Sequence, residues 1–97
     1  MMKKYEIMFI VRADIEEKAV ADTAKAFEKI LTDKKAKIEN SKELGQKKLA
    51  YEINKVNNGY YFLLNVNAPV EAINEFDRKA RIDENILRHL IIKSDEE

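Results

Sequence analysis

The fold is decided by residues 43–68, ELGQKKLAYEINKVNNGYYFLLNVNA, which have the pattern of two β-strands joined by a short loop. Asn-Asn-Gly tolerates the positive φ that tight hairpin loops require, so we expect a hairpin turn over residues 55–59. The strand before this turn should span residues 35–53, and the strand after it residues 60–68. The two strands must pair antiparallel, because a parallel pair needs a much longer connection.

Gly45 lies inside the first of these strands and is one of only two glycines in the chain. A glycine in a strand packs no side chain and costs backbone entropy, so it commonly marks a bulge or a bend. We therefore predict that the strand bends at Gly45, beside Lys47 and Lys48, so that the part after Gly45 pairs in the hairpin while the part before it projects.

A strand and a helix precede the hairpin. Residues 3–12 are nearly all apolar after Glu6, which is typical of a central strand covered at least in part on both faces. Asp14 has Glu17 three residues later, the spacing of a capping box, so we expect Asp14 to cap a helix that ends near Asp33.

A second helix and a last strand follow the hairpin. Pro69 suits the first turn of a helix, and residues 83–85 should form the turn before a strand at 86–93. The order β-α-β-β-α-β predicts an α+β, ferredoxin-like fold, with a four-stranded antiparallel sheet and two helices on one face. We expect a single domain over residues 1–97, with a short disordered acidic tail from about residue 94.

Alternation along the two central strands assigns the faces of this sheet. The fully apolar sets should face the helices: Tyr5, Ile7, Phe9 and Val11, and Tyr60, Phe62, Leu64 and Val66. From the last strand, either Leu87, His89 and Ile91 or Arg88, Leu90 and Ile92 could join the open face, since both sets are largely apolar. A contiguous apolar patch there would mark a protein interface, with Met8, Ile10, Tyr61, Leu63, Leu90 and Ile92 as the candidate partner-binding residues.

The charge is abundant but balanced, with 18 Lys and Arg residues against 18 Asp and Glu residues. A protein that held nucleic acid alone, by neutralising phosphates, should be net positive, so the balance argues against a general nucleic-acid binder. Local basic clusters remain possible contacts. The absence of cysteine suits a reducing cytoplasm, and no apolar run approaches the roughly 20 residues that span a bilayer. We expect a cytoplasmic protein with no membrane association.

Residues suited to catalysis are few. His89 is the only histidine and lies between apolar neighbours, and the chain has too few glycines for a phosphate-binding loop. Acylphosphatase-type enzymes share this fold class, but Arg12 stands alone after the first strand, without the glycines such a loop needs. We expect no enzymatic activity, no small-molecule substrate, no metal and no cofactor.

Several segments together resemble the bacterial small-subunit ribosomal protein S six (S6) family. They are Glu43-Leu44 followed by GQKKLAYEI at 45–53, Lys4-Tyr5-Glu6, Gly59-Tyr60, Pro69 and RIDENILR at 81–88. The resemblance implies a structural ribosomal protein that binds the central domain of the small-subunit ribosomal RNA together with ribosomal protein S eighteen (S18). It also implies RNA contacts near Gly45 and its lysines. The candidate RNA-binding residues are Lys3, Lys4, Lys47, Lys48, Lys55 and Arg88.

Two alternatives share the same element order. An RRM-type module would place third-strand aromatics on the open face to stack bases, but residues 58–62, NGYYF, lack its basic and small residues, and the alternation buries Tyr60 and Phe62. The second alternative is a ferredoxin-like interaction domain that binds a protein partner and no RNA. It would differ from a ribosomal protein only in the molecules that it contacts.

Overall fold

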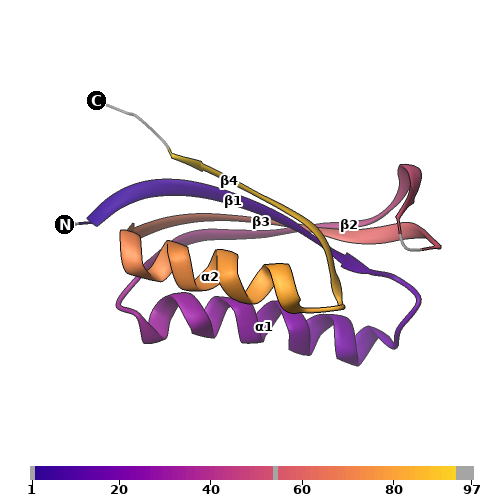
Figure 1. The fold of residues 1–97 in the computed structure, drawn as a ribbon, viewed down its shortest axis with the longest axis horizontal. Helices are drawn as coiled ribbons and strands as arrows, with labels where there is room; N and C mark the ends of the chain where they lie inside the picture. The colour runs from indigo at the N-terminus through magenta and orange to yellow at the C-terminus, as the bar shows by residue number, and fades with distance from the viewer. Residues whose placement is uncertain (1, 54, 94–97) are drawn as a thin grey trace.

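The computed structural model describes residues 2–53 and 55–93 as one sheet with two helices (Figure 1). The elements are β1 (Met2–Arg12), α1 (Glu17–Asp33), β2 (Lys37–Ile53), β3 (Val56–Pro69), α2 (Val70–Ile82) and β4 (Ile86–Lys93). All neighbouring strands are antiparallel, in the order β2-β3-β1-β4, and both helices lie on the same face. This confirms the predicted ferredoxin-like fold; the predicted acidic tail lies outside the described residues.

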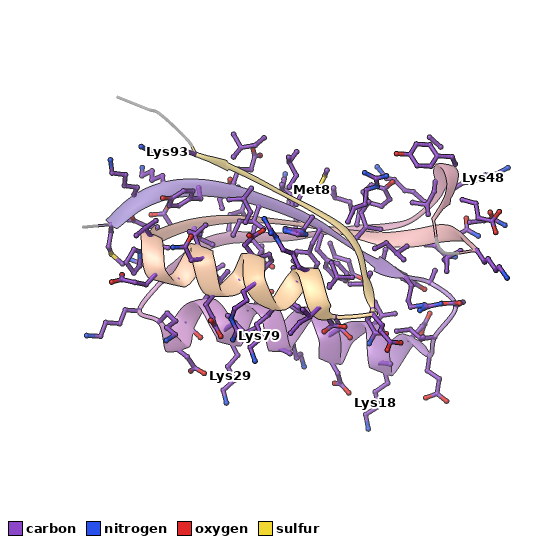
Figure 2. All side chains as sticks on the ribbon, viewed as in Figure 1. Met8, Lys18, Lys29, Lys48, Lys79 and Lys93 are labelled. Atoms are coloured by element: carbon purple, nitrogen blue, oxygen red, sulfur yellow. The ribbon has the colours of Figure 1, made fainter. Side chains whose placement is uncertain are left out.

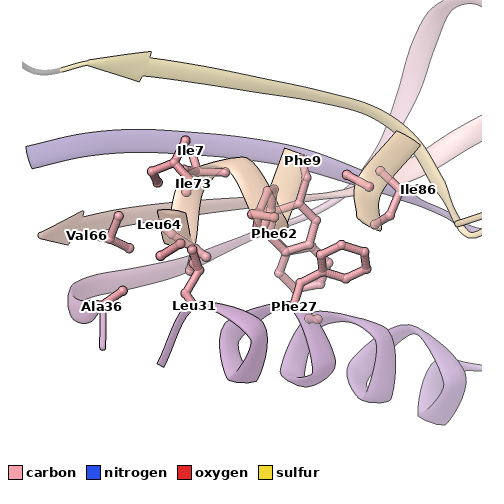
Figure 3. Packing of buried hydrophobic residues seen from close by; sticks show 14 of the residues in the cluster. Ile7, Phe9, Phe27, Leu31, Ala36, Phe62, Leu64, Val66, Ile73 and Ile86 are labelled. Atoms are coloured by element: carbon pink, nitrogen blue, oxygen red, sulfur yellow. The ribbon is translucent and has the colours of Figure 1, made fainter. Parts of the chain in front are cut away.

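The core lies between the helices and the sheet, where all four phenylalanines of the chain meet (Figure 3). Phe9 stacks on Phe62 with ring centroids 5.2 Å apart, and Phe27 meets Phe76 edge to face at 5.2 Å. Burying each of these rings stabilises the fold by roughly 1.5–3 kcal/mol. The predicted inward sets of both central strands are confirmed, with Tyr5 and Tyr60 partly buried at their ends.

The start of α1 differs from the prediction. Its N-cap is Glu16, in an extended conformation and without a side-chain cap, so the capping box predicted at Asp14 is wrong. Asp14 instead accepts two hydrogen bonds from the Arg12 guanidinium, at 2.6 and 2.9 Å. Because the helix begins at Glu17, Asp14 lies two residues before the N-cap position, and its carboxylate pairs with Arg12 instead. The predicted helix end at Asp33 is confirmed.

The hairpin turn lies nearer to β2 than predicted. Ile53 already pairs with Val56, and Lys55 between them has a φ of 65°. The predicted turn over 55–59 is therefore wrong, and Gly59 is a strand residue that pairs with both Arg12 and Lys47. Gly59 is needed there for space: a Cβ at this position would overlap Cγ2 of Ile10.

Two bulges interrupt β2, one of them at the predicted glycine. Glu43 pairs with Phe62 and Gly45 with Tyr61, so Leu44 has no partner on β3, and Gly45 takes a φ of 89° that only glycine adopts easily. A second register shift, between Ile38 and Asn40, leaves Glu39 without a partner. Each extra residue reverses the alternation of faces further along the strand.

Candidate binding face

The face of the sheet opposite the helices is uncovered, and β4 contributes Arg88, Leu90 and Ile92 to it. The register shows this, because Met8 pairs with Leu90 and Glu6 with Ile92, and directly opposed residues share a face. Leu90 and Ile92 are 51% and 48% exposed. The sequence allowed either of two sets of β4 residues on the open face, and the pairing shows that it is this one.

The other β4 set faces the helices, where His89 contacts α2. His89 Nε2 lies 2.7 Å from Oδ1 of Asp77, and Arg81 Nη2 lies 3.1 Å from the other oxygen of the same carboxylate. The hydrogen bond with His89, and then the positive charge of Arg81, hold the pKa of Asp77 below its ordinary value. His89 therefore ties β4 to α2.

The six candidate partner-binding residues all lie on the open face, on β1, β3 and β4. Met8, Tyr61 and Leu63 are partly exposed, whereas Ile10 is only 7% exposed and packs over Gly59. A hollow of about 250 Å³ opens beside them, lined by Met8, Ile10, Arg88, His89 and Leu90. We call this part of the face, made of Met8, Ile10, Tyr61, Leu63, Leu90 and Ile92, the apolar half.

The end of β2 leaves the sheet and rises over the open face as a hook, seen as the pink end of the strand in Figure 1. Its pairing with β3 breaks between Lys48 and Ile53, whereas the part of β2 before Gly45 pairs with β3 from Lys37 to Glu43. The prediction that the part before Gly45 projects is therefore wrong, and the end of the strand projects instead. Tyr51 in this hook accepts a 2.7 Å hydrogen bond from Arg88, whose guanidinium carbon also lies 5.4 Å from the centroid of the tyrosine ring. The hook thus reaches from one edge strand to the other.

Sequence reasoning missed the role of Tyr51. Alternation puts Tyr51 on the side of Lys47, but its contact with Arg88 joins residues 37 positions apart, which no local pattern reveals. Arg88, predicted to bind RNA, is held by this contact in the described structure.

The predicted RNA-binding lysines do not form one cluster. Lys47 and Lys48 pair with Gly59 and Asn58 near the hairpin turn, and Lys55 lies in the turn itself. Figure 2 labels Lys48 at this end of the sheet. Lys3 and Lys4 pair with Ala68 and Asn67 at the other end of β3. Asn67 and Gly59 are eight residues apart, so the two groups lie ~27 Å apart along the sheet.

Charge is distributed unevenly over this neutral chain. The basic side chains at paired positions of the open face are Lys4, Arg12, Lys37, Lys42, Lys47 and Arg88. Among these paired positions Glu6 is the one carboxylate. Arg12 is already paired with Asp14, and its hydrogen bonds lower the pKa of that carboxyl. The open face therefore combines apolar and basic surface.

The third strand does not have the arrangement of an RRM. Tyr60 and Phe62 point toward the helices, and Tyr61 is the aromatic residue of this segment on the open face. Arg12, the arginine at the end of the first strand, forms an ion pair with Asp14.

An open, mixed apolar and basic sheet face on a ferredoxin-like fold is a surface suited to binding a partner. The chain belongs to the ribosomal protein S6 family, because the family model described as ribosomal protein S6 matches residues 4–93. Its structure is similar to a crystal structure of the 30S ribosomal protein S6 of Thermotoga maritima. The two chains are 26% identical, the match covers 97% of this chain and 89% of that one, and the TM-score is 0.90.

Membership of this family makes the chain an RNA-binding protein of the small ribosomal subunit that serves translation. The family consists of structural ribosomal proteins and is not an enzyme family. Within residues 2–53 and 55–93, neither helix is long and apolar enough to cross a membrane.

Proposed function

We propose that this protein binds the central domain of the small-subunit ribosomal RNA together with ribosomal protein S18, as a single domain over residues 1–97 in the cytoplasm. The proposal assigns no catalysis, cofactor or metal to the chain. The single observation that carries it is the exposed apolar half of the open face on a chain of zero net charge.

The apolar half is the surface assigned to S18. Exposed Leu90 and Ile92 lie beside partly exposed Met8 and Leu63 on adjacent strands, so a partner could remove contiguous apolar surface from water. A neutral chain has little electrostatic attraction for RNA, and a basic partner would supply the missing charge. The protein alone should bind the RNA site weakly, and the pair tightly.

RNA contacts are assigned to the two ends of the sheet, through Lys3 and Lys4 at one end and Lys47, Lys48 and Lys55 at the other. Lysines in such positions neutralise phosphates without reading sequence. For a Lys47→Ala, Lys48→Ala double variant with S18, the slope of log K against log salt should fall by roughly 0.7–0.9 per lost contact. An unchanged slope would make these lysines ordinary solvated surface.

The interface with S18 is tested with Leu63→Asp. This change places a charge in the apolar half, directly opposite Met8, so it should weaken association with S18 by more than ~1 kcal/mol, measured by calorimetry. The matched control is Val70→Asp, which adds the same charge at an exposed valine of α2, on the helix side. Equal affinities of parent and Leu63→Asp would place the interface elsewhere.

A further inference from the structure

Three lysines of β2, Lys37, Lys42 and Lys47, recur at intervals of five residues. In a regular strand an odd spacing sends successive members to opposite faces. The two bulges of β2 change this, because one extra residue lies in each interval, Glu39 in the first and Leu44 in the second. All three lysines therefore lie on the open face.

Their partners on β3 give the spacing of this lysine row. Lys37 pairs with Asn67, Lys42 with Leu63 and Lys47 with Gly59, so the partners are four residues apart each time. Neighbouring lysines are thus ~14 Å apart, and the row is ~27 Å long. It follows β2, an edge strand of the sheet.

The lysine row is exposed and unneutralised. All three side chains are exposed, and none lies within ion-pair distance of a carboxylate in the part of the chain that the structure describes. Glu6, the one carboxylate at a paired position of this face, is on β1, with β3 between it and β2. Within the described residues the row therefore carries three positive charges without an ion pair, and exposed Glu39 lies in the bulge between the first two of them.

Amide and aromatic side chains accompany the lysines. Asn40 and Asn65 pair with each other between the first two lysines, and Asn67 is opposite Lys37. At the other end, Lys47 Nζ lies 5.7 Å from the centroid of the Tyr61 ring. Amides can donate to phosphate and ribose oxygens.

We infer that the lysine row binds the sugar-phosphate backbone of an RNA strand that runs along β2, with each lysine on a separate phosphate. This rests on the proposed function and adds to it a path for the RNA and two contacts, Lys37 and Lys42. Evenly spaced positive charges with amides between them match a chain that carries one negative charge on every unit. The same row would repel a basic partner, which keeps S18 on the apolar half.

The test uses the full chain with Lys37→Gln and Lys42→Gln, leaving the lysines of the proposed function in place. Two RNA probes are used: the central-domain RNA in the presence of S18, and single-stranded poly(U) with the chain alone at low salt. The slope of log K against log salt should fall by about 1.4–1.8, since each phosphate contact contributes about 0.7–0.9.

The matched control carries Lys18→Gln and Lys29→Gln, two exposed lysines of α1 that point away from the sheet (Figure 2). It loses the same charge from the helix side, so its slope should equal that of the parent. Hydroxyl-radical footprinting of the central-domain RNA should show a stretch of backbone that the parent protects and the Lys37, Lys42 variant exposes.

The outcomes separate this inference from the proposed function. A lowered slope for the Lys47, Lys48 variant with an unchanged slope for the Lys37, Lys42 variant overturns the lysine row and leaves the proposed function intact. If the parent protein and S18 fail to bind the central-domain RNA, the proposed function fails. The lysine row is then tested by the binding of poly(U) to the chain alone. A reduced slope on poly(U) then supports the row, and equal or absent binding overturns it. If poly-glutamate at equal charge concentration displaces RNA from the lysine row, the row is a binding site for an acidic protein segment and not for RNA.

Discussion

The helix-covered face of the sheet and its open face are made by alternate residues of the same strands. Phe9 and Leu64 are 1% exposed beneath the helices, while Leu90 on the other face is 51% exposed. The helix-covered face completes its packing within the chain, so its side chains determine stability. The open face keeps apolar and basic surface available, so its side chains should matter more for association than for folding.

The largest effect should come from Phe62→Ala on the helix-covered face. Removal of a ring that stacks on Phe9 should lower the free energy of unfolding by about 3–5 kcal/mol, measured by chemical denaturation. Leu63→Ala, one residue away on the open face, should cost clearly less because Leu63 is only partly buried. Similar losses at both positions would break the distinction between the two faces.

Gly59→Ala probes a tightly packed place on the open face, beneath Ile10. The new methyl group would overlap Cγ2 of Ile10, so we expect a loss of about 1–3 kcal/mol from overpacking. The double variant with Ile10→Ala removes the overlap, and its total cost should be less than the sum of the single costs. Additive costs in this cycle would show that the glycine is not required by Ile10.

Gly45→Ala should lower the free energy of unfolding by less, about 1 kcal/mol, because the loss comes from backbone conformation and not from a steric overlap. The backbone there has a φ of 89°, which disfavours any side chain, but a Cβ would meet no atom within 4 Å. Unlike Gly59→Ala, this variant should gain nothing from a smaller neighbour. A cost near zero in thermal or chemical denaturation would mean that the Leu44 bulge relaxes without strain.

The smallest effect concerns pH and the contact between α2 and β4. The pKa of Asp77 is lowered from its ordinary value of 3.8, first by the hydrogen bond with His89 and then by Arg81. A lowered pKa in the folded state means that the stabilisation is present above 3.8 and is lost as pH falls through the folded-state value. Asp77→Asn should therefore cost less than ~1 kcal/mol at pH 6, and the difference from the parent should shrink toward pH 3. A difference that grows on acidification would contradict the assignment.

The order of the elements, the inward-facing sets of both central strands, the end of α1 and an irregularity in the strand at Gly45 could all be predicted from the sequence. These features have local causes: strands alternate every second residue, helices repeat about every 3.6 residues, and glycine relieves a positive φ. The segments that resemble the S6 family also led to the correct family.

Features that depend on contacts between residues far apart in the chain could not be predicted from local patterns. Both sides of β4 are largely apolar, so the sequence could not show which side faces the helices. The pairing of β4 with β1 determines it. The hairpin turn lies nearer to β2 than predicted, because Gly59 is needed as a strand residue beneath Ile10. Tyr51 contacts Arg88 across the sheet. The lysine row exists because two bulges change the alternation of β2 against β3, and such a register is set by the pairing partner and not by spacing along one strand.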